Sequence, residues 1–82
     1  MKKDKSNVPS LDLHGATEAE VFDLVDRFLT KQNAPTVRII SGKGKGIVKK
    51  KLIEYLKLAR YTWTFEKLPN GSQNEGVLIV QL

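Results

Sequence analysis

The side chains that could do chemistry lie in two short segments of the chain. The first is Leu11-Asp12-Leu13-His14-Gly15, which holds a carboxylate and the single histidine of the protein. Strand alternation would put Asp12 and His14 on the same face, about 7 Å apart along the chain. Both groups could then reach one bound phosphate or one metal ion. The alternative is structural, with His14 bonded to the turn and Asp12 to nearby backbone amides.

The second segment, residues 41–46, is basic and rich in glycine. Its glycines permit positive φ angles, and its successive amides could form an anion-binding nest ahead of a helix N-terminus. The glycine spacing matches neither the P-loop nor the dinucleotide-binding fingerprint. We therefore predict phosphate binding here, the alternative being a flexible turn with solvated lysines. The predicted nucleic-acid-binding residues are Ser41, Gly42, Lys43, Gly44, Lys45, Gly46, Lys49 and Lys50.

The charge of the chain is unevenly distributed, although its formal net value is only +5. Residues 38–60 hold eight basic residues against one acid, Glu54. A positive segment of this density attracts polyanions over roughly a Debye length, about 8 Å in physiological salt. The charge pattern favours DNA or RNA as the partner, the alternative being a lysine-rich face that only aids solubility.

The composition excludes several other classes of protein. The chain has no cysteine, which rules out disulfides, a thiolate nucleophile and a zinc–thiolate site. No apolar run approaches the length that spans a bilayer, and the N-terminus lacks the apolar core of a signal peptide. We therefore expect a soluble, cytoplasmic protein with no membrane partner. We expect a disordered basic tail over residues 1–10 and one small folded domain over residues 11–82.

The elements that must position these segments follow from the hydrophobic pattern. Alternating or β-branched apolar residues predict strands over residues 11–13, 37–40, 61–66 and 76–82. A capping box formed by Thr17 and Glu20 predicts a helix that ends near Lys31, and a second amphipathic pattern predicts a helix over residues 47–59. The last strand is apolar on both faces, which is typical of an interior strand.

This order, β-α-β-α-β-β, predicts an α/β two-layer sandwich. Both crossovers should be right-handed, which places both helices on one face of the sheet. The alternating aromatics Tyr61, Trp63 and Phe65 could stack on bases if they faced outward. We favour a core position for most of them, because a small domain needs its large apolar groups inside.

The two segments together resemble the Smr (small MutS-related) domain family. The likeness rests on Leu11-Asp12-Leu13-His14-Gly15 before a helix and on Gly42-Lys43-Gly44-Lys45-Gly46 opening a second helix, and it covers residues 11–82. It implies a fold similar to the C-terminal domain of translation initiation factor 3, a four-stranded mixed sheet in which the last strand is interior and antiparallel to the others. It also implies endonuclease activity on DNA or RNA, with Asp12 and His14 in cleavage and the glycine segment in nucleic-acid contact.

The chain departs from the family pattern at Ser41, where many members have a histidine, and at Asn74-Glu75-Gly76 near the last strand. With one histidine, an acid–base mechanism that uses two imidazoles of the same chain is excluded. Cleavage would depend on Asp12 with Mg²⁺ or Mn²⁺, or on His14 as base with lysines stabilising the phosphate. The departure therefore bears on catalysis more than on binding.

Three functions remain open at this point. The first is an Smr-type endonuclease that nicks structured DNA or RNA, which the complete first motif favours. The second is a non-catalytic DNA- or RNA-binding module, which Ser41 favours. The third is a protein–protein adaptor without a nucleic-acid partner. Because domains of this family often sit at the end of longer proteins, the resemblance also allows for a place in a larger protein or complex.

Overall fold

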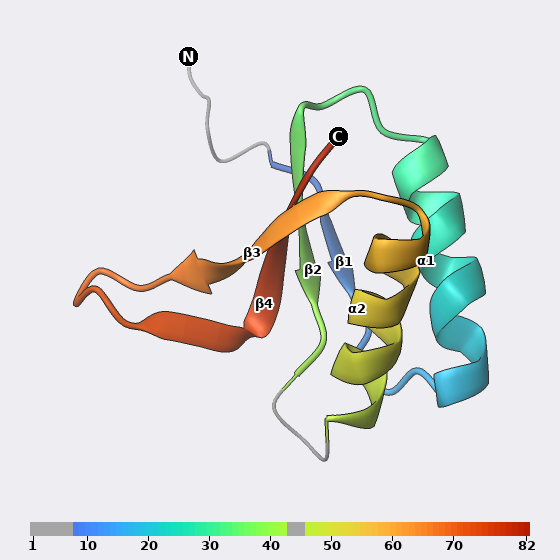
Figure 1. Ribbon diagram of the computed structural model, residues 1–82, viewed down its shortest axis with the longest axis horizontal. Coiled ribbons are helices and arrows are strands. Elements are labelled where there is room, and N and C mark those ends of the chain that lie inside the picture. Colours follow the sequence, from blue (N-terminus) through green and yellow to red (C-terminus); the bar gives the residue numbers. More distant parts are fainter. Residues whose placement is uncertain (1–7, 43–45) are drawn as a thin grey trace.

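A computed structural model describes residues 8–42 and 46–82, which form a sheet with helices packed against one of its faces (Figure 1). The first half contains strand β1 (Ser10–Asp12), the short 3-10 helix η2 (Glu18–Glu20), helix α1 (Val21–Thr30) and strand β2 (Thr36–Ile40). The second half contains helix α2 (Ile47–Leu58), strand β3 (Thr62–Lys67) and strand β4 (Gln73–Gln81). Helices α1 and α2 lie side by side on the same face, which confirms the predicted two-layer α/β class.

The sheet has four strands in the order β1-β2-β4-β3. Strand β1 runs parallel to β2, while β4 lies between β2 and β3 and is antiparallel to both. The prediction of a mixed sheet with an interior last strand is therefore confirmed. Its physical basis is also visible, because Leu78 and Val80 are fully buried on β4 and Ile79 between them is half-buried on the other face.

Local sequence explains how helix α1 begins and what it buries. The backbone N–H of Thr17 donates to the Glu20 carboxylate at 2.8 Å, which is one arm of the predicted capping box. The first turn is 3-10 rather than α-helical, so the α-helix itself starts at Val21. Val21, Val25 and Leu29 follow at helical spacing and are buried. Together with Leu52 and Leu56 of α2 they form the helical half of the core.

Strands β2 and β3 supply the sheet half of the core by simple alternation. Val37 and Ile39 are fully buried under the helices, while Arg38 between them points to the opposite, uncovered face. On β3, Trp63 and Phe65 pack against the core, with their ring centroids 5.1 Å apart and their planes at 75°. The prediction that these aromatics serve the core is confirmed.

Strand β4 is longer than the sequence pattern predicts, and it contains a bulge. The structure starts it at Gln73 rather than at residue 76. Phe65 pairs with Leu78 but the next residue, Glu66, pairs with Asn74, so residues 75–77 have no partner on β3. The bulge bends the β3–β4 hairpin away from the rest of the sheet (Figure 1).

The N-terminal boundary also differs slightly from the prediction. Ser10 already belongs to β1, and the carbonyl of Pro9 accepts a hydrogen bond from the Arg38 amide at 2.9 Å. Pairing with β2 therefore orders a part of the segment that was predicted as tail. Residues 1–7 lie outside the described part of the chain. No helix among the described residues is long and apolar enough to cross a membrane.

Candidate nucleic-acid interface

The two chemistry-bearing segments meet at one edge of the sheet. Because β1 and β2 are parallel neighbours, their carboxyl ends lie at the same edge, with Asp12 opposite Ile40. The contact continues past the end of both strands, where the Leu13 N–H donates to the Ile40 carbonyl at 2.8 Å. The turn that carries Asp12 and His14 is thus next to Ser41 and Gly42, where the glycine segment begins.

The Asp12–His14 turn has a clear local cause. One carboxylate oxygen of Asp12 accepts the backbone N–H of His14 at 2.8 Å, which forms an Asx turn. Gly15 follows with a φ of 87°, a conformation that favours glycine. Leu13, only 1% exposed, anchors the turn in the core, so that Asp12 and His14 on either side of it are exposed.

The structure is compatible with both roles that the sequence left open for Asp12, a structural role in the turn and a role in ligand binding. Its bond to the His14 amide is the structural role, and its exposure leaves the carboxylate accessible to a ligand. The strand ends at Asp12, so His14 belongs to the turn rather than to the strand. None of the hydrogen bonds found among residues 8–42 and 46–82 uses the imidazole.

The described residues around Asp12 offer few ligands to a metal ion. Within the described part of the chain, no three His, Cys, Asp or Glu side chains gather closely enough to hold an ion. Mg²⁺ is often held by one or two carboxylates together with substrate phosphates and waters. The donor set is therefore compatible with an ion shared between Asp12 and a bound phosphate, and it does not fit an ion held by the protein alone.

The entrance of the glycine segment is fixed to strand β4. The amides of Ser41 and Gly42 both donate to the Gly76 carbonyl, at 2.8 and 3.2 Å. Ser41 is 8% exposed, and its hydroxyl also lies 3.4 Å from the Gly76 carbonyl oxygen. The side chain of Ser41 is therefore directed inward and helps to hold the loop entrance to β4, while the contact of this residue with nucleic acid stays a prediction. Lys43, Gly44 and Lys45 fall outside the described residues.

The two described glycines of the segment adopt the positive φ angles expected of them, but the Gly42 amide, which was expected to contribute to an anion-binding nest, donates to the Gly76 carbonyl instead. Gly42 and Gly46 have φ angles of 83° and 82°, in the left-handed region where a side chain would be strained. Gly46 is the N-cap of α2, and its carbonyl accepts the first helical hydrogen bond from Lys50 at 2.9 Å. The backbone conformation at both positions therefore favours glycine.

Beyond Gly46, the surface of α2 carries a basic groove with a volume of about 410 Å³. It is lined by Gly46, Lys49, Lys50, Ile53, Glu54 and Lys57. Lys50 and Lys57 are exposed and seven residues apart, which places them on one side of the helix two turns from each other. Lys57 is not among the site residues predicted from the sequence, although its spacing from Lys50 already places it on the same side of the helix.

Lys49 differs from its exposed neighbour Lys50. Its ammonium lies 3.6 Å from the Glu75 carboxylate and 5.6 Å from the centre of the Phe65 ring. The side chain is only 28% exposed. Lys49 therefore already has an anionic partner, which a phosphate would have to displace.

Removal of that partner is expected to strengthen polyanion binding. In Glu75→Gln, Lys49 keeps its charge and loses its competitor, so we expect the dissociation constant for DNA or RNA to fall about threefold at low salt. Fluorescence anisotropy with a labelled oligonucleotide measures this change. The matched control is Asp23→Asn, which removes one charge from an exposed pair with Arg27 on α1. Equal shifts in both variants would contradict a specific competition at Lys49.

Away from this edge, Tyr55 connects the two helices. Its hydroxyl donates to the Asp26 carboxylate at 2.9 Å. Burial, together with the hydrogen bond and negative charge of Asp26, raises the pKa of Tyr55 from 10.0 to about 12. Folding therefore favours the protonated phenol, so this stabilisation is complete below pH 10 and is lost as the pH rises toward 12.

The variant Tyr55→Phe is expected to lose this contribution. At neutral pH it should lower the free energy of unfolding by less than about 1 kcal/mol, because the bond is exposed. Between pH 10 and 12 the difference from the wild-type protein should shrink. Urea unfolding followed by Trp63 fluorescence across this pH range measures both effects. A difference that stays constant with pH would contradict the assignment.

Comparison with known proteins shows the family of the chain. The Smr domain family matches residues 11–82, which is nearly the whole chain. The chain belongs to the Smr family. The crystal structure of the Smr domain of Thermus thermophilus MutS2 superposes with a TM-score of 0.75 at 31% sequence identity, and the match covers 90% of this chain and 96% of that one. The expected family and its fold are therefore confirmed.

Curated relatives of this Smr domain carry the name Endonuclease MutS2. The protein from Thermus thermophilus is 32% identical over 85 aligned positions, which cover 100% of this chain and 11% of the relative. The protein from Helicobacter pylori is 37% identical over 75 positions, which cover 88% of this chain and 10% of the relative. The chain thus corresponds to a small part of these much longer proteins.

Proposed function

We propose that this Smr domain binds structured DNA or RNA and cleaves a phosphodiester bond at the sheet edge formed by β1 and β2. The observation that carries the proposal is the hydrogen bond from Leu13 to Ile40, which joins the Asp12–His14 turn to the entrance of the glycine segment. A carboxylate, an imidazole and a basic helix N-terminus then face one stretch of polynucleotide. The endonuclease name of the MutS2 relatives supports the same activity.

In this proposal each group has a separate chemical task. Asp12 acts as the base for the attacking water, or holds it through a Mg²⁺ or Mn²⁺ ion shared with the substrate phosphate. His14 orients the scissile phosphate or transfers the proton. Lys50 and Lys57 neutralise phosphates further along the strand, and we extend the same role to Lys43 and Lys45 from their sequence position alone.

The second candidate function is nucleic-acid binding without cleavage. Two observations favour it. Ser41 is a buried anchor at the position where the resemblance leads us to expect a histidine. The Asp12 carboxylate already serves the turn through its bond to His14. A binding module would keep the salt-dependent affinity and would show no turnover with any divalent ion.

One experiment separates the two candidates. The purified protein is incubated with supercoiled plasmid and with a structured RNA, each with Mg²⁺, with Mn²⁺ and with EDTA. Nicked plasmid or shortened RNA in proportion to protein concentration supports the endonuclease. Binding in a gel-shift assay without any product supports the second candidate. Absence of both binding and cleavage contradicts the proposal as a whole.

A further inference from the structure

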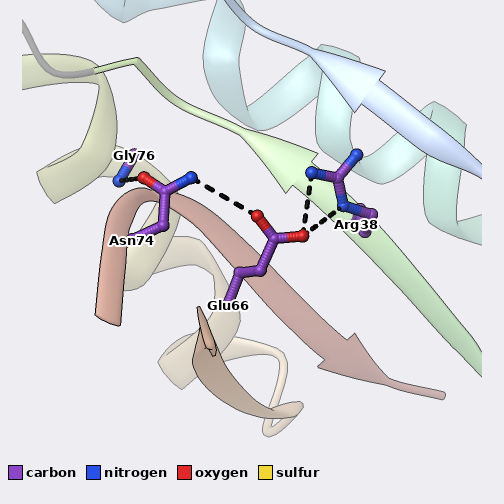
Figure 2. Close-up of polar contacts among 4 residues, drawn as sticks. All are labelled: Arg38, Glu66, Asn74 and Gly76. Atoms are coloured by element: carbon purple, nitrogen blue, oxygen red, sulfur yellow. Dashed lines mark hydrogen bonds and ion pairs between the residues drawn. The ribbon is translucent and has the colours of Figure 1, made fainter. Parts of the chain in front are cut away.

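A chain of polar contacts crosses the sheet on the face that the helices leave uncovered (Figure 2). The Nε of Arg38 on β2 donates a hydrogen bond to one carboxylate oxygen of Glu66 on β3 at 2.9 Å, and Nη2 lies 2.9 Å from the same oxygen in an ion pair. The other oxygen of Glu66 accepts the side-chain N–H of Asn74 at 3.3 Å. The side-chain oxygen of Asn74 accepts the backbone N–H of Gly76 at 3.1 Å. We call these residues, Arg38, Glu66, Asn74 and Gly76, the polar chain.

The polar chain ends at the residue that anchors the glycine segment. Gly76 lies in the β4 bulge, where β3 offers no pairing partner to fix the backbone. Its N–H is held by Asn74, and its carbonyl accepts the amides of Ser41 and Gly42. The Gly76 backbone is thus connected, through Asn74 on the same strand, to the side chains of Glu66 on β3 and Arg38 on β2.

Each link of the polar chain has only one possible direction. Arginine and a backbone N–H can only donate, so acceptors must face both ends of the chain. The Glu66 carboxylate accepts at both oxygens, and the Asn74 amide accepts from Gly76 while it donates to Glu66. The Arg38 and Glu66 side chains are 33% and 26% exposed, so water replaces a lost partner only in part.

We propose that Glu66 and Asn74 are positioning residues that hold the β4 bulge, and through it the Ser41–Gly42 entrance, in the geometry that binds a phosphate backbone. This inference rests on the proposed function for its link to nucleic acid. Neither side chain needs to touch the ligand. They act through Gly76, whose carbonyl sets the direction of the two loop amides.

The direction of the links allows a test by exchange of partners. In Glu66→Gln the NH₂ group of the new glutamine faces the NH₂ group of Asn74, so two donors meet and this link is lost. If the Asn74 amide flips to avoid this, its NH₂ group faces the N–H of Gly76, and the link to Gly76 is lost instead. In Asn74→Asp, two carboxylates face each other. When both substitutions are combined, the new glutamine accepts from Arg38 and donates to the new aspartate, which in turn accepts from Gly76. The double variant therefore restores every link and keeps the net charge of the wild-type protein.

Two readouts are measured on the wild-type protein, the single variants and the double variant. The first is hydrogen exchange of the Ser41 and Gly42 amides by NMR, without any nucleic acid. The second is the dissociation constant for a labelled DNA hairpin and a labelled RNA hairpin. We expect each single variant to lose protection at both amides and to bind about fivefold more weakly, and the double variant to return to within about twofold of wild type.

The Glu66→Gln variant separates positioning from simple charge. It makes the protein more positive, so long-range attraction alone predicts tighter binding, whereas positioning predicts weaker binding. The matched control Asp23→Asn has the same charge change on α1 and should keep the protection of Ser41 and Gly42. Thermal unfolding by circular dichroism verifies that each variant is folded.

Two results would overturn the inference. One is unchanged exchange at Ser41 and Gly42 in both single variants, and the other is a double variant that fails to recover. A failure of the proposed function gives a different result from these two, because in that case the wild-type protein itself binds neither the DNA hairpin nor the RNA hairpin. The amide exchange would still decide whether the polar chain holds the loop entrance.

Discussion

Replacement of Asp12 by asparagine is expected to lower the rate of phosphodiester cleavage at least about a hundredfold, while the affinity for nucleic acid changes less than about twofold. Asparagine keeps the oxygen that accepts the His14 amide at 2.8 Å, so the Asx turn should remain. It loses the negative charge that a base or a metal ligand needs. The substitution therefore separates the chemical role of Asp12 from its structural role.

Cleavage is measured as nicking of supercoiled plasmid and of a structured RNA with Mg²⁺ or Mn²⁺, and affinity is measured by anisotropy with EDTA. Asp12→Ala removes both the charge and the turn, and it should also lower the free energy of unfolding by about 1 kcal/mol. Asp23→Asn is the matched control for charge, because Asp23 is an exposed acid on α1. Full cleavage by Asp12→Asn would exclude Asp12 from the chemistry.

The double variant Lys50→Ala with Lys57→Ala is expected to weaken binding at least about tenfold at low salt. Each lysine that contacts a phosphate contributes about 0.9 to the slope of log K against log salt for duplex DNA. Loss of both should flatten that slope by about two, because both side chains are exposed along the α2 groove. Cleavage at saturating protein should change much less than affinity.

The control for this variant must remove the same charge from another surface. Arg27→Ala with Lys31→Ala does so on and just beyond α1, where both residues are exposed. Titrations from low to high salt give the slope for both double variants. The assignment of the α2 groove fails if both flatten the slope equally, since net charge alone would then explain the loss.

The part of the fold that depends on local pattern was predictable from the sequence. The capping box of Thr17 and Glu20 and the alternation of Trp63 and Phe65 each involve neighbours in the chain, and both are present in the structure. The start of β4 was not predictable in the same way. Gln73, Asn74 and Glu75 are polar, and this part of the strand is defined by the pairing of Gln73 and Asn74 with β3 beyond the bulge.

In the candidate site, too, the features set by neighbouring residues were predictable from the sequence, and those set by long-range contacts were not. The exposure of Asp12 and His14 follows from Leu13, whose burial between them is visible in the sequence as alternation. The burial of Ser41 is not visible, because its partner Gly76 lies 35 residues away in the chain. Sequence spacing therefore identifies which residue types are present at this edge, and long-range contacts decide which of them face the solvent.

Residues 75–77, which have no partner on β3, make the number of residues in this part of β4 important for the fold. Side chains alternate between the two faces of a strand. The loss of one residue there would therefore move the side chains on one side of the deletion to the opposite face of the sheet. The Gly76 carbonyl would also lose its alignment with the amides of Ser41 and Gly42. Substitutions in this stretch are thus far safer for protein engineering than deletions or insertions.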